Sequence, residues 1–357
     1  MHKDDLMTPK ERSIALAQGK DVDRMPVSLI CLGPAGQLIN MSYKEAYSNA
    51  KNRANNQMKA YELFGFDDLN LIYSLHALAI SMGAEMSEPN EGAPSILVHP
   101  VKDLNDLSVL DLEKVSFKKD KIAQMVVEAH EIIKDELGDE ISVGTSLPGP
   151  LTAASSLVGT ATLLKGFLTN PENVHRLLEF CSDAIINIAK IFLDANLQIG
   201  LADPMASGSV INKSRYDTFV LPYTKKIVDA CKSYKDICFG YHVCGNTTKL
   251  LESMPKTGVD AIGLDNLVDM AVAKEKIGHL VSLAGNVPLV EVVYLGDEKT
   301  IDFAIKECFR KAWDSPRGYT LTTGCDLPVK TPIDNIYAYM RSARYYAKYP
   351  LDPERFI

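Results

Sequence analysis

The chain has 357 residues, of which 46% are hydrophobic, enough for one large core or two smaller ones. Asp and Glu number 46 against 38 Lys and Arg, and the net charge of -8 argues against a nucleic acid or an anionic membrane as the main partner. No stretch approaches the roughly 18 consecutive apolar residues of a membrane span, and the polar N-terminus lacks a signal core, so we expect a cytoplasmic protein.

Eight short apolar runs alternate with longer amphipathic segments, and we expect each run to be a β-strand. Each run is nearly continuously apolar, which is typical of parallel strands covered on both faces. The runs are residues 27–32, 68–72, 141–147, 199–205, 237–243, 260–264, 280–284 and 318–322. Eight strands separated by helices predict an α/β fold, a (β/α)8 TIM barrel formed by residues 1–357 as a single domain.

The helical segments carry the expected period. Val174, Leu177, Leu178 and Cys181 recur at i, i+3, i+4 and i+7, and Asn170 before Pro171 is a helix start signal. We expect this helix to cover the barrel.

Two connections are longer than a barrel needs. A helix that begins at Pro9 precedes the first strand and predicts an N-terminal extension. Residues 33–67 and 73–140 exceed simple strand-to-helix loops, so we expect an inserted region that forms a lid or a small hairpin.

Polar residues follow the later strands, where the catalytic groups of such barrels lie. We expect these ends to face one opening. They carry Asp203 and Ser207 after the fourth strand, His242 and Cys244 at the fifth, Asp265 after the sixth, Gly285 and Asn286 after the seventh, and Cys325 after the eighth.

His242 and Cys244 are two residues apart, so in a strand their side chains point to the same side. Cys325 follows a strand that can lie across the same opening. Thiolate sulfur and imidazole nitrogen are donors that zinc prefers, and three protein ligands leave a fourth position for water or substrate. We predict that these three residues bind catalytic zinc.

A single buried Cys or His is more often a packed core residue than a metal ligand. Strand-end positions, with Gly245 and Gly324 beside the ligands, favour metal binding for the three residues above. The remaining cysteines have no spacing that adds to the site, and we expect them in the core: Cys31, Cys181, Cys231, Cys238 and Cys308.

Several segments resemble the uroporphyrinogen decarboxylase family, whose members are (β/α)8 barrels. They are Arg24-Met-Pro-Val27 at the entry to the first strand, Leu147-Pro-Gly-Pro150, residues 258–265 and residues 283–288. The resemblance spans essentially the whole chain. The decarboxylases carry Arg-Gln-Ala-Gly-Arg after the first strand and Phe-Ser-Asp after the second, whereas this chain has Cys31 to Gly36 and Tyr73-Ser-Leu-His76. Decarboxylation of uroporphyrinogen is therefore the less favoured alternative.

Within that family the chain resembles the corrinoid-dependent methyltransferases of the methylcobamide:coenzyme M type. These carry His-x-Cys and a distant Cys as zinc ligands, matched here by His242, Cys244 and Cys325. The resemblance implies that a zinc-bound thiolate attacks the methyl group of a methyl-Co(III) corrinoid, giving a thioether and Co(I). It implies a small corrinoid protein as a transient partner and a thiol acceptor such as coenzyme M.

Other functions stay open. A homocysteine-like thiol or tetrahydrofolate could be the acceptor, and a non-catalytic corrinoid- or metal-binding protein with structural zinc is a further alternative. A closed site with a fourth protein ligand would favour that last alternative, and no fourth Cys or His is placed to provide it.

The other polar strand ends have two interpretations each. Asp265 is a candidate fourth ligand or acceptor of the thiol proton, or else a cap for the following helix. Asn286 and Asp203 can position substrate or orient His242, or else serve as turn residues. We include Ser207 and Gly285 with Asp203 as candidate cofactor-binding residues.

Overall fold

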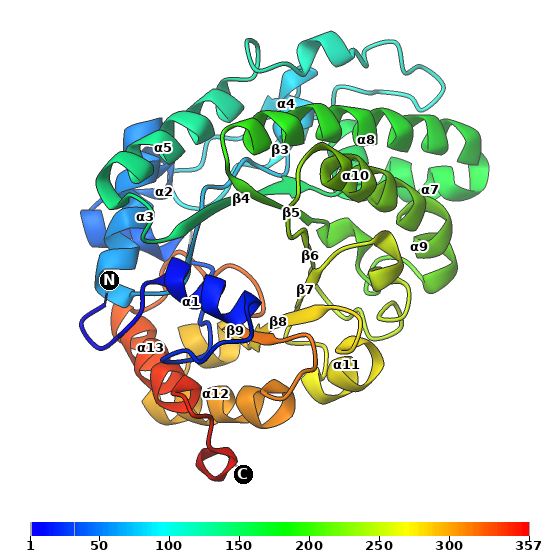
Figure 1. Ribbon diagram of the computed structural model, residues 1–357. Coiled ribbons are helices and arrows are strands. Elements are labelled where there is room, and N and C mark those ends of the chain that lie inside the picture. Colours follow the sequence, from blue (N-terminus) through cyan, green and yellow to red (C-terminus); the bar gives the residue numbers. More distant parts are fainter. Residues whose placement is uncertain (1, 32, 357) are drawn as a thin grey trace.

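Seven parallel strands form one curled sheet in this computed structural model, which describes residues 2–31 and 33–356 (Figure 1). The strand order is β1-β4-β5-β6-β7-β8-β9. Their bounds are β1 Asp68–Asn70, β4 Ser142–Pro148, β5 Gln198–Ala202, β6 Gly240–Val243, β7 Ala261–Leu264, β8 Ser282–Val287 and β9 Tyr319–Thr323. Seven of the eight predicted strands are thereby confirmed, with shifted ends.

The segment at Val27 lies between the two edges of this sheet. Val27 forms a parallel bridge with Leu321 of β9, and the backbone N–H of Asp67, just before β1, donates to the Val27 carbonyl at 2.9 Å. The prediction of a full strand here is wrong for the described residues of the segment, and Leu32 lies outside them. The Asp67 carboxylate accepts from the Val27 N–H at 2.6 Å and so takes a donor that a strand ladder would use. The arrangement is consistent with a TIM barrel.

Two predicted strands end or begin elsewhere for local reasons. The strand predicted to extend to Met205 ends at Ala202. Pro204 has no N–H to donate to a neighbouring strand, and it begins the 3-10 turn Pro204–Ala206. The strand predicted to begin at residue 237 begins at Gly240 instead. Just before it, the N–H of Phe239 donates to the carboxylate of Asp260 at 2.8 Å and not to a neighbouring strand.

Helices surround the sheet (Figure 1). They are α1 Pro9–Ala17, α2 Tyr43–Ala46, α3 Ala50–Phe64, α4 Ala77–Ser81, α5 Lys121–Leu137, α6 Pro150–Val158, α7 Thr160–Thr169, α8 Pro171–Asp194, α9 Lys213–Phe219, α10 Leu221–Tyr234, α11 Met270–Ile277, α12 Glu298–Ala312 and α13 Ile333–Ala347. The prediction for α8 is confirmed, because all four residues of its apolar stripe are buried and Asn170 caps its start.

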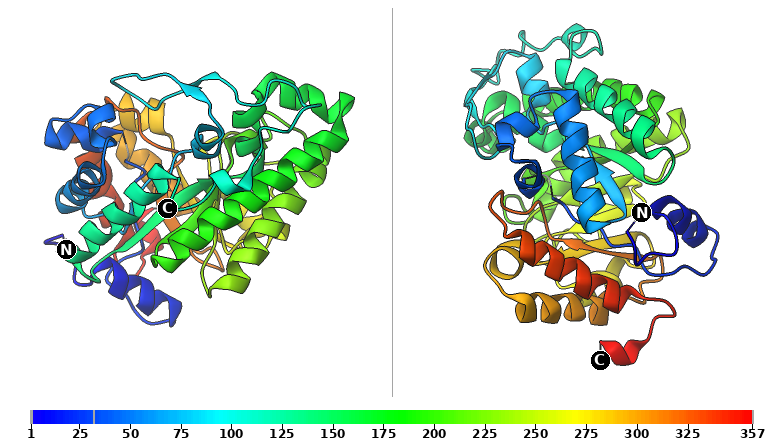
Figure 2. Two further views of the ribbon diagram at one scale, coloured as in Figure 1. Left: turned by 90° about the horizontal axis from the view of Figure 1, so that it is seen from above. Right: turned by 90° about the vertical axis from the view of Figure 1, so that its left-hand side faces the viewer.

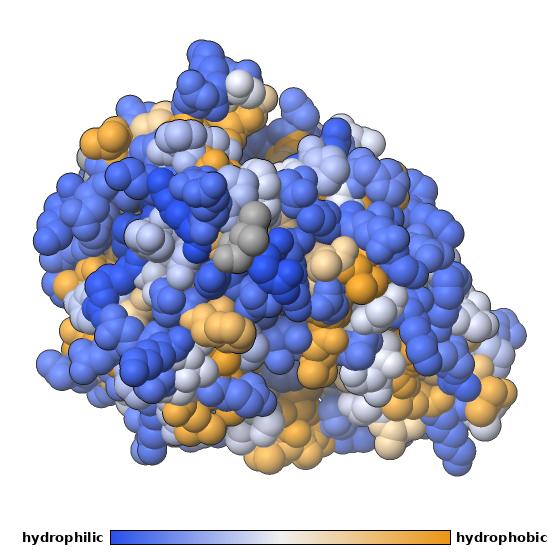
Figure 3. Space-filling model, turned by 90° about the horizontal axis from the view of Figure 1, so that it is seen from below, coloured by the Kyte–Doolittle hydropathy of each residue, from blue (hydrophilic) through white to orange (hydrophobic). Residues whose placement is uncertain are grey.

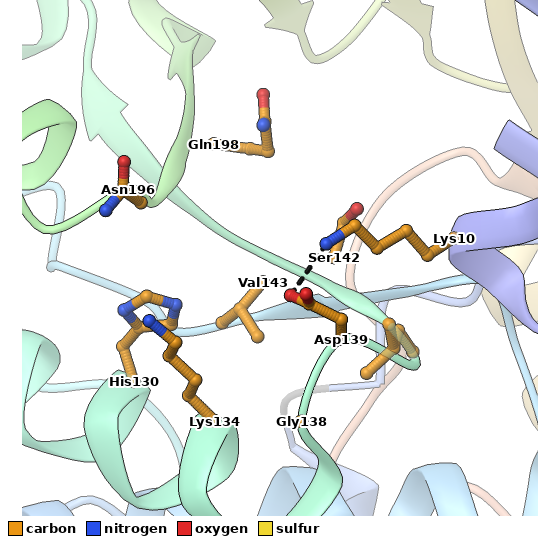
Figure 4. A pocket seen from close by; sticks show the side chains of 10 residues that line it. Lys10, His130, Lys134, Gly138, Asp139, Ser142, Val143, Asn196 and Gln198 are labelled. Carbon is orange, nitrogen blue, oxygen red and sulfur yellow. Dashed lines mark ion pairs between the residues drawn. The ribbon is translucent and has the colours of Figure 1, made fainter. Parts of the chain in front are cut away.

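The two ends of the sheet carry different elements. At the amino-terminal end, the N–H of Lys10 in α1 donates to the carbonyl of Glu140 at 3.1 Å, and a pocket of about 300 Å³ opens beside the first residues of β4 and β5 (Figure 4). Near the opposite end lie the short antiparallel strands β2 (Glu85–Met86) and β3 (Ile96–Val98), in the segment drawn in cyan (Figure 2, left). The N-terminal extension and the lid stay predictions.

Among the described residues, no single helix is long and apolar enough to cross a membrane. By length and composition alone, α6 and α7 together could cross a membrane, as a pair bent by 105°. Every residue of α6 is buried. The face that carries α12 and α13 is largely hydrophilic, with apolar side chains in small separate patches (Figure 3).

Candidate metal centre

Three side chains converge at the carboxyl-terminal end of the sheet. His242 Nε2 lies 3.3 Å from Cys244 Sγ, which lies 3.6 Å from Cys325 Sγ. The three ligand atoms are all within 4.8 Å of one another, and the described part of the chain holds no other such group of His, Cys, Asp or Glu. We call His242, Cys244 and Cys325 the ligand trio. The curl of the sheet brings it together, because β6 and β9 are three strands apart in the order.

Glycine beside His242 leaves room for the imidazole. Gly263 on β7 pairs in register with His242, and a Cβ added to it would lie 3.0 Å from His242 Nδ1. An alanine at this position would therefore press on the ring. Sequence analysis missed Gly263, although a glycine inside a short apolar strand is a signal of close approach.

The turn that follows Cys244 is supported by the loop after β5. Gly245 has φ of 76°, and a Cβ added to it would lie 2.4 Å from Ser207 Oγ. Ser207 accepts from the N–H of Ser209 at 3.1 Å, and the Ser209 hydroxyl accepts from the N–H of Asn246 at 3.1 Å. The structure thus places the predicted residue Ser207 against the backbone that presents Cys244.

The two thiols of the trio ionise unequally. Their mutual hydrogen bond lowers the pKa of Cys325 and raises the pKa of Cys244, while burial opposes ionisation of both. One thiolate held by one thiol is the favoured state without a cation, since a second negative charge 3.6 Å away is repelled. A dication between them would remove that repulsion, and the donor set of two sulfurs and one nitrogen fits zinc.

Asp265 fixes the same turn from the other side. Its Oδ2 accepts from the N–H of Gly245 at 2.8 Å, and its Oδ1 accepts from the N–H of Leu267 at 3.0 Å. Its charge is near enough to contribute to the raised pKa of Cys244, after the larger effects of Cys325 and burial. Its roles as fourth ligand and proton acceptor stay predictions.

Asn286 and Gly285 connect β8 to the end of β7. The Asn286 amide donates to the carbonyls of Asp265 at 2.9 Å and Val268 at 2.6 Å, and the peptide between Gly285 and Asn286 is cis. A Cβ added to Gly285 would lie 2.7 Å from the carbonyl oxygen of Leu264. In this structure the amide nitrogen therefore braces the loop of Asp265.

Asp203 lies between the start of α6 and His242. Its buried carboxylate accepts from the N–H of Leu151 at 3.3 Å, from the N–H of Thr152 at 2.8 Å and from the Thr152 hydroxyl at 2.6 Å. Burial raises its pKa to about 6, against the hydrogen bonds from Thr152. Its own N–H donates to the His242 carbonyl at 2.9 Å, so it holds the backbone of His242.

Four of the other five cysteines are buried as predicted, and the prediction for Cys238 is wrong because this residue is exposed. The predicted strand would have buried it. Because β6 begins only at Gly240, Cys238 lies in the connection before the strand.

Comparison with known proteins agrees with this architecture. The family model described as uroporphyrinogen decarboxylase (URO-D) matches residues 8–346. The chain belongs to the uroporphyrinogen decarboxylase family. It is 31% identical to the methylcobamide:CoM methyltransferase MtbA of Methanosarcina mazei, over 95% of this chain and 98% of that protein.

More distant members of the family are also similar. The chain is 26% identical to the uroporphyrinogen decarboxylase of Parasynechococcus marenigrum, over 92% of this chain and 94% of that protein. A solved methyltransferase structure from Methanosarcina mazei matches with a TM-score of 0.84 and 25% identity, covering 96% of this chain and all of that one.

Proposed function

We propose that this protein transfers a methyl group from a methylated corrinoid to a thiol, with zinc held by the ligand trio and coenzyme M as the first candidate acceptor. The observation that carries the proposal is the convergence of one imidazole and two thiols within 4.8 Å at the carboxyl-terminal end of the sheet. The similarity to a methylcobamide:CoM methyltransferase supports the reaction type. We also propose that the chain forms one TIM-barrel domain, in which the bridge at Val27 stands in place of the predicted first strand.

The chemistry of the trio explains why such a site suits a thiol. Bound zinc supplies the positive charge that keeps a substrate thiol ionised at neutral pH, where a free thiol with pKa near 8.5 is mostly protonated. Two thiolates and a neutral imidazole balance the dication, so a third sulfur would keep negative charge and remain a nucleophile. Gly263 leaves space for the imidazole, while Ser209 and Asp265 hold the turn that presents Cys244.

The reaction balances with the two substrates alone. The acceptor sulfur forms a bond to the methyl carbon, the cobalt–carbon bond breaks, and its electron pair stays on cobalt, which passes from Co(III) to Co(I). The thiol proton is lost to a base or to solvent, and Asp265 is the candidate base. A transiently docked corrinoid protein would present the methyl group, and a homocysteine-like thiol or tetrahydrofolate are the alternative acceptors.

Removing one ligand tests the proposal. We expect purified protein to contain about one zinc per chain and to convert methylcobalamin and 2-mercaptoethanesulfonate to the thioether. Cys325→Ala should lose most of the zinc and lower kcat/KM on the order of 10³-fold, since a catalytic metal supplies several kcal/mol. Metal analysis and loss of methylcobalamin absorbance measure the two effects.

Cys238→Ala is the matched control, because this thiol is exposed and lies outside the trio. It should keep zinc and activity. Absence of stoichiometric zinc in the wild type, or unchanged activity of folded Cys325→Ala, would refute the proposal. Release of CO2 from uroporphyrinogen would instead favour the decarboxylase alternative.

A further inference from the structure

A second pocket, of about 460 Å³, opens beside the residues that follow β1. Its walls are largely apolar and come from α2, the start of α3, α4 and the β2–β3 region. We call it the Arg53 pocket. Its lining includes Arg53, Tyr43, Tyr47, Ile72, Ile80 and Met86.

Arg53 is a buried cation without a carboxylate partner. It is 7% exposed, and its guanidinium donates to the carbonyls of Ile72 at 2.7 Å and Tyr47 at 3.3 Å and lies 5.3 Å from the centre of the Tyr47 ring. Among the described residues, no Asp or Glu lies within ion-pair distance of it. Burial lowers the pKa of Arg53, against the effects of Tyr47 and Tyr43. An unpaired buried charge of this kind is costly unless an anion completes it.

The remaining charges of the Arg53 pocket cancel. Lys44 and Glu88 are exposed at its rim and pair with each other at 2.8 Å. His76 bonds through Nδ1 to the Ser156 hydroxyl at 2.8 Å, and burial lowers its pKa, which favours the neutral ring. The interior therefore offers one cation beside apolar side chains such as Ile80 and Met86. This chemistry suits a small organic anion with an aliphatic part.

The Arg53 pocket is close to the ligand trio. Tyr43 and Tyr47 lie near Asp326, the neighbour of Cys325, so that its charge adds to burial in raising the pKa of both phenols. The carbonyl of Ile72 lies just beyond β1, and only the Val27 segment separates β1 from β9. With strands about 4.8 Å apart, β1 and β9 are roughly 10 Å apart at the level of Val27.

We propose that the Arg53 pocket binds the anionic group of the thiol acceptor, with the guanidinium as its counter-ion and the apolar wall against its carbon chain. This inference rests on the proposed function. It makes Arg53 a specificity-determining residue, which selects thiols that carry a sulfonate or carboxylate over neutral thiols. A planar guanidinium can bond two oxygens of such a group at once.

The kinetic test compares a charged with a neutral acceptor. We expect Arg53→Gln to raise KM for 2-mercaptoethanesulfonate about 10- to 100-fold, the size of a lost charge-assisted hydrogen bond, and to change KM for 2-mercaptoethanol less than about twofold. Arg53→Lys should recover part of the loss. Arg215→Gln is the matched control, because Arg215 stacks on Phe167 outside this pocket. An equal change in KM for both thiols in folded Arg53→Gln and Arg53→Lys would overturn the proposal.

A binding test separates this inference from the proposed reaction. Ethanesulfonate has no thiol, so its binding, measured by calorimetry or by ligand-observed NMR, needs neither zinc nor corrinoid. We expect it to bind to the wild type and to Cys325→Ala but not to Arg53→Gln. That result supports the inference even if methyl transfer is absent. Equal binding to wild type and folded Arg53→Gln, or no binding to the wild type at millimolar concentration, refutes it even if methyl transfer is present.

Discussion

The amino-terminal and carboxyl-terminal ends of the sheet differ in whether their buried charges have partners of opposite charge. At the first end, Arg12 and Arg24 are buried among three carboxylates, with Arg12 Nε 2.7 Å from Asp23 and Arg24 Nη2 2.8 Å from Asp5, while Asp67 pairs with both. Hydrogen bonds and charge from Asp5 and Asp67 raise the pKa of Arg24 despite its burial.

At the other end, Arg53 donates to two backbone carbonyls with no carboxylate within ion-pair distance among the described residues, and the thiols of Cys244 and Cys325 lie 3.6 Å apart. Matched charges belong to the permanent structure, whereas unmatched ones indicate where a metal ion or a substrate completes the molecule. This contrast predicts that substitutions at the first end change stability and that substitutions at the second change binding.

The strongest test of the matched end is Asp67→Asn. It removes a carboxylate that Arg12 and Arg24 share and that also accepts from the Val27 N–H. We expect the free energy of unfolding to fall by about 3 to 5 kcal/mol, as when one partner of a buried ion pair is lost. Urea denaturation measures this. Zinc content per folded molecule should not change, and a loss below about 1 kcal/mol would contradict the contrast between the two ends.

A change of pH should have an intermediate effect on the free energy of unfolding. The hydrogen bond from Arg12, together with those from the N–H groups of Leu6 and Met7, outweighs burial and lowers the pKa of Asp23 from 3.8 to about 2. Below pH about 4 the unfolded chain therefore binds a proton that the folded protein does not, and stability falls as pH falls towards about 2. Unfolding free energies at pH 5 and pH 3 should differ less in Asp23→Asn than in the wild type. An identical pH dependence in both proteins would disprove this role.

The smallest effect is expected for an exposed pair at the same end. Lys10 and Asp139 are 2.7 Å apart beside the pocket of Figure 4, but both side chains are open to solvent. Exposed pairs of this kind are screened and contribute little. Lys10→Gln should leave the urea midpoint unchanged within error, and a clear decrease would show that burial is not what distinguishes the Arg12 and Arg24 pairs.

Much of the fold could be predicted because nearly continuous apolar runs mark parallel strands. Strand ends could not be, since they depend on contacts distant in sequence. The Asp67 carboxylate reduces the first strand to a bridge at Val27, and the Asp260 carboxylate engages Phe239 before β6 begins. Such side-chain bonds to the backbone leave no local pattern.

The ligand trio was predictable because His-x-Cys and a later Cys differ chemically from their neighbours. Arg53 was not identified, although it lies on the buried stripe of α3 with Ala50, Ala54 and Gln57. An arginine on such a stripe is a detectable signal, but one sequence cannot show whether a carboxylate meets it. The bond that Asp265 accepts from the N–H of Gly245 joins residues 20 positions apart and likewise leaves no local pattern.

The ligand trio also has a consequence for how the protein matures. Cys244 and Cys325 are separated by 81 positions, and Cys325 follows the last strand of the sheet. The trio can therefore hold a metal with all three ligands only after Cys325 has been synthesised and β9 has docked beside β8. Metal binding would then be a late step of maturation, which only molecules with β9 in place can complete. Bound metal would also link the segments of Cys244 and Cys325 and stabilise them against unfolding.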